Sequence, residues 1–223
     1  MSHSKNSEAV PVLPDTAAYL LDTAERLFAE RGIDNVSMRE IVRASGQGNL
    51  SAAHYHFGSR DALIGALVER RVRVINELRH RRLDRLEASG RNQDVHAIVS
   101  ATVGVLGDVV KAQPWGPDYV KVAAQALFSP QVHVRRLIDP GAMSGHARCT
   151  AMLRALLPGL SERVFKDRIW MINNEAVYCI ARWIHQHGPV TPASSRSYAA
   201  MIRTAVDFLA AGMAAPVDKA ARG

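Results

Sequence analysis

One short segment of the chain carries several side chains that could bind phosphate. Ser51, Tyr55 and Arg60 supply hydroxyl and guanidinium donors, and His54 and His56 supply imidazoles. Such groups hydrogen-bond to the phosphate oxygens of a nucleic acid without needing a large net positive charge. These residue types therefore favour nucleic-acid recognition over other kinds of chemistry.

A metal site is the first alternative for these histidines. At a spacing of two residues, His54 and His56 would face different directions on a helix, and no cysteine or nearby carboxylate joins them. His185 and His187 share this spacing close to an expected helix end, where solvated side chains are the simpler interpretation. We therefore predict no metal site.

Catalytic motifs are also missing from the sequence. It has no G-x-S-x-G, P-loop, H-E-x-x-H or dinucleotide fingerprint, so we predict no enzymatic activity and no cofactor. Titratable residues of the C-terminal part are scattered without a recognisable spacing: His96, His133, Asp139, His146 and Cys149.

Three helical patterns must position the phosphate-binding candidates. Apolar residues recur at helical spacing over 15–31, and Gly32 can end that helix. Ser37 and Glu40 form an S-x-x-E capping box for a short second helix. After a glycine-containing turn, a third helix should run over 49–58. The two short helices indicate a helix-turn-helix, whose second helix is sized for a major groove.

A long fourth helix should follow over 59–90, with Leu63, Leu67, Val74 and Leu78 on its buried side. Beyond Arg60 near its start, it carries seven more arginines: Arg70, Arg71, Arg73, Arg79, Arg81, Arg82 and Arg85. Acidic residues are interleaved with them, which favours a solvated face over a phosphate-binding stripe.

Glycines and prolines divide the remaining helical pattern. Further helices are predicted at 94–113, 117–129, 131–139, 142–157, 161–187 and 194–213. Because no alternating strand pattern occurs, we expect an all-α protein. Its expected parts are an N-terminal arm (1–14), a three-helix head (15–62), a larger helical body (63–215) entered by the long helix, and a C-terminal tail (216–223).

Composition limits the possibilities further. The 223 residues are 48% hydrophobic, enough to bury a globular core. The net charge of +7 divides into +1 over residues 1–90 and +6 over residues 91–223, so the total charge does not argue for a nucleic-acid-binding head. Cys149 and Cys179 are too few for a disulfide framework. With no evident secretion signal or membrane-spanning stretch, we expect a cytoplasmic protein without a membrane partner.

The head resembles the TetR family of bacterial transcriptional regulators over about residues 15–68. The motifs that carry the resemblance are TAERLFAERG (23–32), SMREI (37–41) and HYHFGSRDAL (54–63). Two features depart from the family pattern: the turn SGQGN is one residue longer than usual, and HYH stands where Tyr-x-Tyr is frequent. Both concern which base is recognised rather than whether DNA is bound.

The resemblance implies an operator interface and a dimer. The residues implied to contact DNA are Ser37, Met38, Arg39, Gln47, Asn49, Leu50, Ser51, Ala52, His54, Tyr55, His56 and Arg60. A homodimer that pairs its last two long helices would place two recognition helices on a near-palindromic operator.

The resemblance also implies an effector pocket in the body. Its candidate residues are Trp115, Tyr119, Phe128, Met143, Met152, Trp170, Asn173, Asn174 and Tyr178, for which plain core packing is the alternative. Asn173 lies on an apolar stripe and could bond a ligand, pair across a symmetric interface or bond a neighbouring carbonyl. Four body arginines favour a hydrophobic effector with an anionic end: Arg135, Arg136, Arg148 and Arg154.

We therefore expect a ligand-responsive repressor that a small hydrophobic effector releases from DNA through the long fourth helix. The alternative is an all-helical small-molecule-binding protein or enzyme with a degenerate DNA-binding head.

Overall fold

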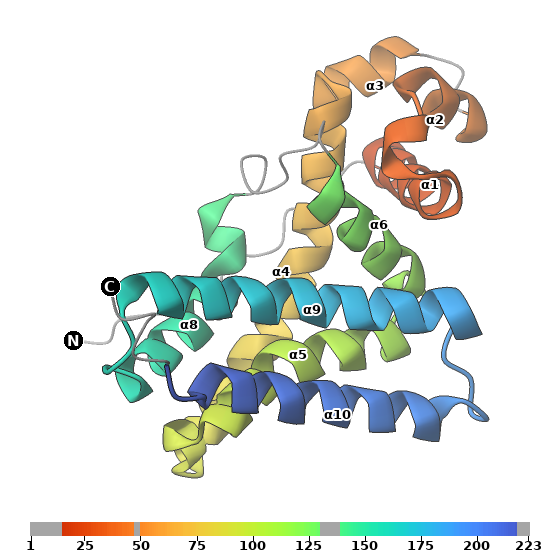
Figure 1. Ribbon diagram of the computed structural model, residues 1–223. Coiled ribbons are helices and arrows are strands. Elements are labelled where there is room, and N and C mark those ends of the chain that lie inside the picture. Colours follow the sequence, from red (N-terminus) through yellow and green to blue (C-terminus); the bar gives the residue numbers. More distant parts are fainter. Residues whose placement is uncertain (1–14, 47–49, 130–138, 218–223) are drawn as a thin grey trace.

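The head contains three helices and one 3-10 turn. The computed structural model describes residues 15–46, 50–129 and 139–217, among which no strand occurs. The head elements are α1 (Asp15–Arg31), η1 (Ile33–Asn35), α2 (Met38–Ala44) and α3 (Leu50–Phe57). The helix that follows, α4 (Arg60–Ala88), leaves the head and runs through the molecule (Figure 1).

The body elements are η2 (Arg91–Gln93), α5 (Val95–Ala112), α6 (Gly116–Phe128), η3 (Pro140–Met143), α8 (Ser144–Leu156), α9 (Glu162–His187) and α10 (Ser195–Ala214). These bounds agree closely with those predicted from glycine and proline spacing. Residues 130–138, where one more helix is expected, lie outside the described residues. The predicted all-α class with a helix-turn-helix head is confirmed.

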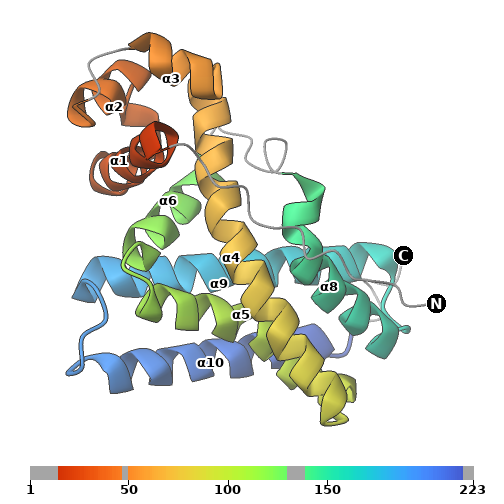
Figure 2. The ribbon, with the colours of Figure 1, turned by 180° about the vertical axis from the view of Figure 1, so that it is seen from behind.

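The helix α5 forms the centre of the body. It packs against α10, α4, α8, α6 and α9. Over 95–112 it is long and apolar enough to cross a membrane by length and composition, but 67% of that window is buried inside the protein. Its apolar character therefore fits the interior of this helical body. Seen from behind, α4 crosses α5 on its way from the head (Figure 2).

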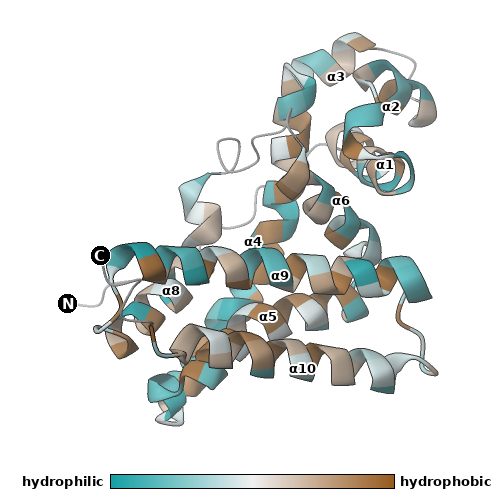
Figure 3. Cartoon of the chain, in the orientation of Figure 1, coloured by the Kyte–Doolittle hydropathy of each residue, from teal (hydrophilic) through white to brown (hydrophobic). Residues whose placement is uncertain are grey.

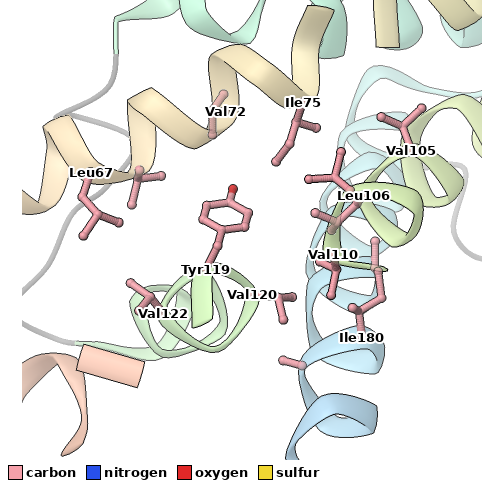
Figure 4. Packing of buried hydrophobic residues seen from close by; sticks show 14 of the residues in the cluster. Leu67, Val72, Ile75, Val105, Leu106, Val110, Tyr119, Val120, Val122 and Ile180 are labelled. Atoms are coloured by element: carbon pink, nitrogen blue, oxygen red, sulfur yellow. The ribbon is translucent and has the colours of Figure 1, made fainter. Parts of the chain in front are cut away.

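One continuous apolar core links head and body. In Figure 4 the ring of Tyr119 points from α6 toward α4, where Val72 and Ile75 flank it, while Leu106 and Val110 approach from α5. Because α6 also packs against α1, it lies between the head and the central helix (Figure 1).

The buried side of α4 differs from the one predicted. Leu63 and Leu67 are buried as expected, but Val74 and Leu78 are only half-buried. Polar residues take buried places instead: Arg71, Asn76 and Arg79. The reason is that α4 passes from α1 to α6, α5 and α8 along its length, so that no single stripe stays buried.

Candidate nucleic-acid interface and body cavity

The helix α2 begins at a reciprocal cap between Ser37 and Glu40. The Glu40 N–H donates to the Ser37 Oγ at 3.3 Å, and the Ser37 N–H donates to the Glu40 carboxylate at 2.8 Å. Hydrogen bonds from the Ser37 backbone N–H and, to a smaller extent, from its hydroxyl hold the pKa of the Glu40 carboxyl below its usual range. The predicted capping box is confirmed, and the hydroxyl of exposed Ser37 also donates to the Glu40 carboxylate at 2.8 Å.

The outer face of α2 presents two arginines. Arg39 and Arg43 are both exposed, and their spacing of four residues places them on one side of the helix. Sequence reasoning missed Arg43, although this spacing could have found it. Met38, an expected DNA contact, is only 8% exposed and packs into the head core because it faces inward at the helix start.

The helix α3 presents the polar surface expected of a recognition helix. Ala53 is fully buried and anchors the helix, while Ser51, His54 and Tyr55 are exposed, Tyr55 at 87%. The other candidates divide into Leu50, Ala52 and His56, which are half-buried, and Gln47 and Asn49, which lie outside the described residues. Fewer residues of α3 are therefore exposed for DNA contact than the sequence predicted.

Arg60, an expected phosphate contact, is engaged within the head. Its Nε donates to the Val36 carbonyl at 2.8 Å, and its Nη2 donates to the Ile33 carbonyl. The guanidinium also lies over the Phe28 ring, 5.5 Å from the ring centre. As the first residue of α4, Arg60 points back onto the segment between α1 and α2, and these bonds join α4 to that segment.

The histidine pairs form local contacts. The Nδ1 of His54 lies 3.0 Å from the Gly58 carbonyl oxygen, and the His187 ring stacks on Trp183. In the described parts of the chain no group of three or more His, Cys, Asp or Glu side chains is placed to hold a metal.

The arginines of α4 include one that is deeply buried between head and body. Arg71 is 6% exposed, and its Nε donates to both carboxylate oxygens of Glu25 at 3.1 Å. Its guanidinium also bonds Asp22 and lies over the Trp115 ring. Burial raises the pKa of Glu25 despite this partner. The expected solvated face is therefore wrong for Arg71, because α1 and Trp115 cover it.

Head and body also meet where η1 contacts α6. The Ile33 N–H donates to the Gln125 Oε1 at 2.7 Å, and the Ser129 Oγ donates to the Asp34 carboxylate at 2.7 Å. A displacement of the last turns of α6 would therefore also displace η1, the segment that precedes α2.

The body contains a cavity of about 850 Å³ between α4, α5, α6, α8 and α9. Five of the nine predicted pocket residues line it: Tyr119, Met143, Trp170, Asn173 and Asn174. Sequence reasoning missed six polar residues in its wall: Arg79, Thr102, His146, Thr150, Lys166 and Asp167. Their types carry no local pattern, and only the packing of separate helices brings them together.

The other four predicted pocket residues lie elsewhere. Trp115 lies beneath Arg71 and meets the Tyr119 ring edge-on at 5.8 Å. Phe128 and Tyr178 border a second, shallower hollow of about 540 Å³ beside η1. Met152 is half-buried against the core. All four lie in the body, but none is among the residues that line the cavity.

Asn173 bonds a histidine side chain of its own chain, rather than a neighbouring carbonyl as considered from the sequence. Its Nδ2 lies 3.2 Å from the Nε2 of His146, and both residues line the cavity. The amide therefore helps to fix the His146 ring at the cavity wall.

Two of the four arginines that favoured an anionic effector, Arg148 and Arg154, are not among the residues that line the cavity. Arg148 bonds Asp84 and Glu87 at 2.7 Å each. Arg154 donates to the Pro158 and Leu160 carbonyls. Arg135 and Arg136 lie outside the described residues. These residues therefore give no support for an anionic ligand.

The outer side of α9 and α10 exposes large apolar side chains. The two helices pack side by side along one face of the body (Figure 1). Met171 and Tyr178 of α9 are exposed, as is Phe208 of α10 at 74%. Apolar and neutral residues run along α10 in Figure 3.

Comparison with protein families gives two matches that together span most of the chain. Residues 20–67 match the model described as bacterial regulatory proteins, tetR family. Residues 100–212 match the model described as tetracyclin repressor-like, C-terminal domain. A comparison with curated protein sequences finds no match.

Several solved structures share the fold. FadR from Bacillus halodurans has 14% identity and a TM-score of 0.59, covering 92% of this chain and 100% of its own. FadR from Bacillus subtilis in complex with stearoyl-CoA has 13% identity and a TM-score of 0.59, covering 87% and 98%. A tetR family transcription regulator from Shewanella sp. PV-4 has 18% identity and a TM-score of 0.61, covering 88% and 96%. At these identities the likeness concerns the fold alone.

Proposed function

This chain belongs to the TetR family of bacterial regulatory proteins, and we propose that it acts as a ligand-responsive transcriptional repressor in the cytoplasm. The proposed active form is a homodimer on a near-palindromic operator. A small hydrophobic effector in the body releases the DNA. The protein is proposed to bind and to respond, without catalysing a reaction.

The observation that carries the proposal is the exposed face of α3. Ser51, His54 and Tyr55 face outward on a helix held by buried Ala53, and Arg39 and Arg43 lie exposed on the neighbouring α2. Hydroxyl, imidazole and guanidinium donors grouped in this way suit phosphates and base edges of a duplex. Their value does not depend on the net charge of the head.

A dimer is supported by the apolar outer side of α9 and α10. Met171 and Phe208 are exposed on these helices, and burial of such large side chains would stabilise a four-helix contact between two copies. A two-fold dimer would present two copies of α3 to half-sites one DNA turn apart.

The cavity supports the effector part of the proposal. Its volume of about 850 Å³ lies in the range of small-molecule sites, roughly 300–1,000 Å³. Tyr119 of α6 borders it, and α6 also bonds η1 of the head through Gln125. The stearoyl-CoA bound by the Bacillus subtilis FadR agrees with a hydrophobic ligand in a fold of this kind.

Release then follows from linkage. An effector that favours a spacing of the two heads unsuited to the operator weakens DNA binding, and DNA weakens effector binding by the same factor. Because Arg71 of α4 and Gln125 of α6 both contact the head, two helices rather than α4 alone would transmit the shift.

The test is a gel shift with the DNA upstream of the protein's own gene, measured over a series of salt concentrations. We expect a complex that survives competition by unrelated DNA and weakens linearly on logarithmic axes as salt rises. If every DNA competes equally well at moderate salt, sequence-specific regulation is ruled out. Turnover of a bound metabolite by such a protein would favour the enzyme alternative.

A further inference from the structure

Arg79 is a buried cation at the wall of the cavity. It lies on α4, is 8% exposed and borders the cavity together with Thr102 of α5. Its Nη1 donates to the Asn76 Oδ1 at 2.9 Å, and its Nη2 donates to the Thr102 carbonyl at 3.4 Å. Both acceptors are neutral.

No carboxylate neutralises Arg79 in the described part of the chain, whereas the equally buried Arg71 has Glu25 and Asp22. Asp167, which also lines the cavity, is exposed on α9. Residues 130–138, which join Leu127 and Pro140 of the cavity wall, contain no acidic residue. Burial accordingly lowers the pKa of Arg79. A buried charge without a counter-charge is costly to the folded protein.

Two hydrogen-bond donors beside this charge have no acceptor among the described residues. The Arg79 Nε and the Asn76 Nδ2 are buried and unbonded. Two donors hold the Asn76 amide in one orientation, because its Oδ1 accepts from Arg79 at 2.9 Å and from the His146 N–H at 3.2 Å. Among the described residues, this corner of the body therefore has more hydrogen-bond donors than acceptors, and its charge is positive.

The rest of the cavity suits an apolar molecule. Val72, Ile75, Leu106 and Phe165 contribute apolar walls. Tyr119 enters from α6, and burial raises its pKa to about 12, so its hydroxyl keeps its proton at neutral pH. In Figure 4 this hydroxyl points toward α4 near Val72 and Ile75.

We propose that the cavity binds a small hydrophobic carboxylic acid whose carboxylate pairs with Arg79. The ligand's carboxylate would accept from the Arg79 guanidinium, whose Nε has no partner among the described residues, and its hydrocarbon part would fill the apolar remainder. This inference rests on the proposed function and specifies the chemical class of its effector. A neutral ester or thioester offers a carbonyl acceptor but no counter-charge for Arg79.

The first experiment measures ligand binding to the full-length protein without DNA. The probes are dodecanoate and 4-phenylbutyrate, the methyl ester of each, dodecylamine and dodecanoyl-CoA, followed by calorimetry and thermal shift. We expect one of the acids to bind saturably and at least about tenfold more tightly than its own ester, since a charge-assisted pair is lost in the ester. Equal binding of acid and ester, or tighter binding of the amine or the CoA thioester, would overturn the proposal.

The second experiment compares Arg79→Met with Arg82→Met. Arg82 lies one turn further along α4 and pairs with Asp108 away from the cavity, so its replacement controls for loss of an arginine from this helix. We expect Arg79→Met to lose at least about tenfold in acid affinity while the ligand-free melting temperature stays the same or rises. A fall in that melting temperature with acid binding retained would show that Arg79 is structural.

Arg79→Lys provides a second test of the Arg79–carboxylate pair if Arg79→Met does not fold. It retains the charge but not the planar pair of donors, so acid binding should be weakened and acid should still be preferred over ester. Loss of that preference in Arg79→Lys contradicts the proposal.

Failure of this inference is distinguishable from failure of the proposed function. Acid binding without release of DNA would leave the carboxylate site in place and remove the repressor mechanism. Specific DNA binding without any preference for acid over ester would support the proposed DNA-binding function and rule out the carboxylate site.

Discussion

The backbone N–H of Ile33 in the head donates to the side-chain Oε1 of Gln125 on α6 at 2.7 Å. The two residues are 92 positions apart in the chain, and the bond joins the turn before α2 to a helix that also borders the cavity. Breaking this bond therefore tests how much it contributes to holding the head on the body.

Gln125→Ala should loosen this junction. Removing the acceptor leaves a half-buried N–H unpaired, so we expect a loss of about 1 kcal/mol in the free energy of unfolding and faster hydrogen exchange at the Ile33 amide. Hydrogen exchange read by NMR checks the second effect. Gln186→Ala, at an exposed position of α9, is the control and should leave that amide unchanged.

Arg43→Ala should weaken DNA binding without affecting folding. Arg43 is exposed on α2, so we expect lower affinity for specific and unrelated DNA alike and a decrease of about one unit in the salt slope. The gel-shift titration checks both. Arg26→Ala removes an exposed arginine of α1 that pairs with Glu30, and an equal effect there would assign the loss to total charge rather than to position.

Arg60→Ala should act mainly through stability. Its guanidinium donates to the Val36 and Ile33 carbonyls and covers Phe28, so its removal leaves two acceptors unpaired inside the head. We expect a loss of about 1–3 kcal/mol by urea unfolding. A variant that unfolds like the original protein but binds DNA with a reduced salt slope would instead identify Arg60 as a phosphate contact.

The capping box predicts a pH dependence that can be isolated with Glu40→Gln. Because the bonds from Ser37 hold the folded-state pKa of Glu40 below that of an ordinary glutamate, its stabilising contribution is present above the ordinary pKa and is lost as pH falls through the folded pKa. Thermal unfolding from about pH 6 to about pH 3 should show wild type and variant converging toward the acid end. A constant difference between them would mean that ionised Glu40 does not stabilise α2.

Phe208→Glu should disrupt the proposed dimer. A carboxylate on the outer side of α10 cannot be buried without a large penalty, so sedimentation velocity should show the mass of a single chain. Tyr19→Glu, which alters an exposed aromatic residue of α1, should leave the mass unchanged. Persistence of a dimer in Phe208→Glu would place the contact elsewhere.

Local signals in the sequence determined the helices and the head motif. The first helix ends at Arg31 as predicted, Ser37 and Glu40 cap α2, and Ser59 caps α4. Caps and glycines act on backbone groups within a few residues, so neighbouring letters suffice to read them. The family motifs rest on the same stretch of chain.

Tertiary structure decided which side chains are available for function. Met38 and Arg60 lie within or beside the family motifs, yet one packs in the core and the other bonds carbonyls 24 and 27 residues away. Arg71 and Arg79 look alike in an arginine-rich helix, but only Arg71 meets carboxylates, because α1 crosses it and the cavity borders Arg79. Burial and charge pairing depend on segments far apart in sequence, and no local pattern encodes them.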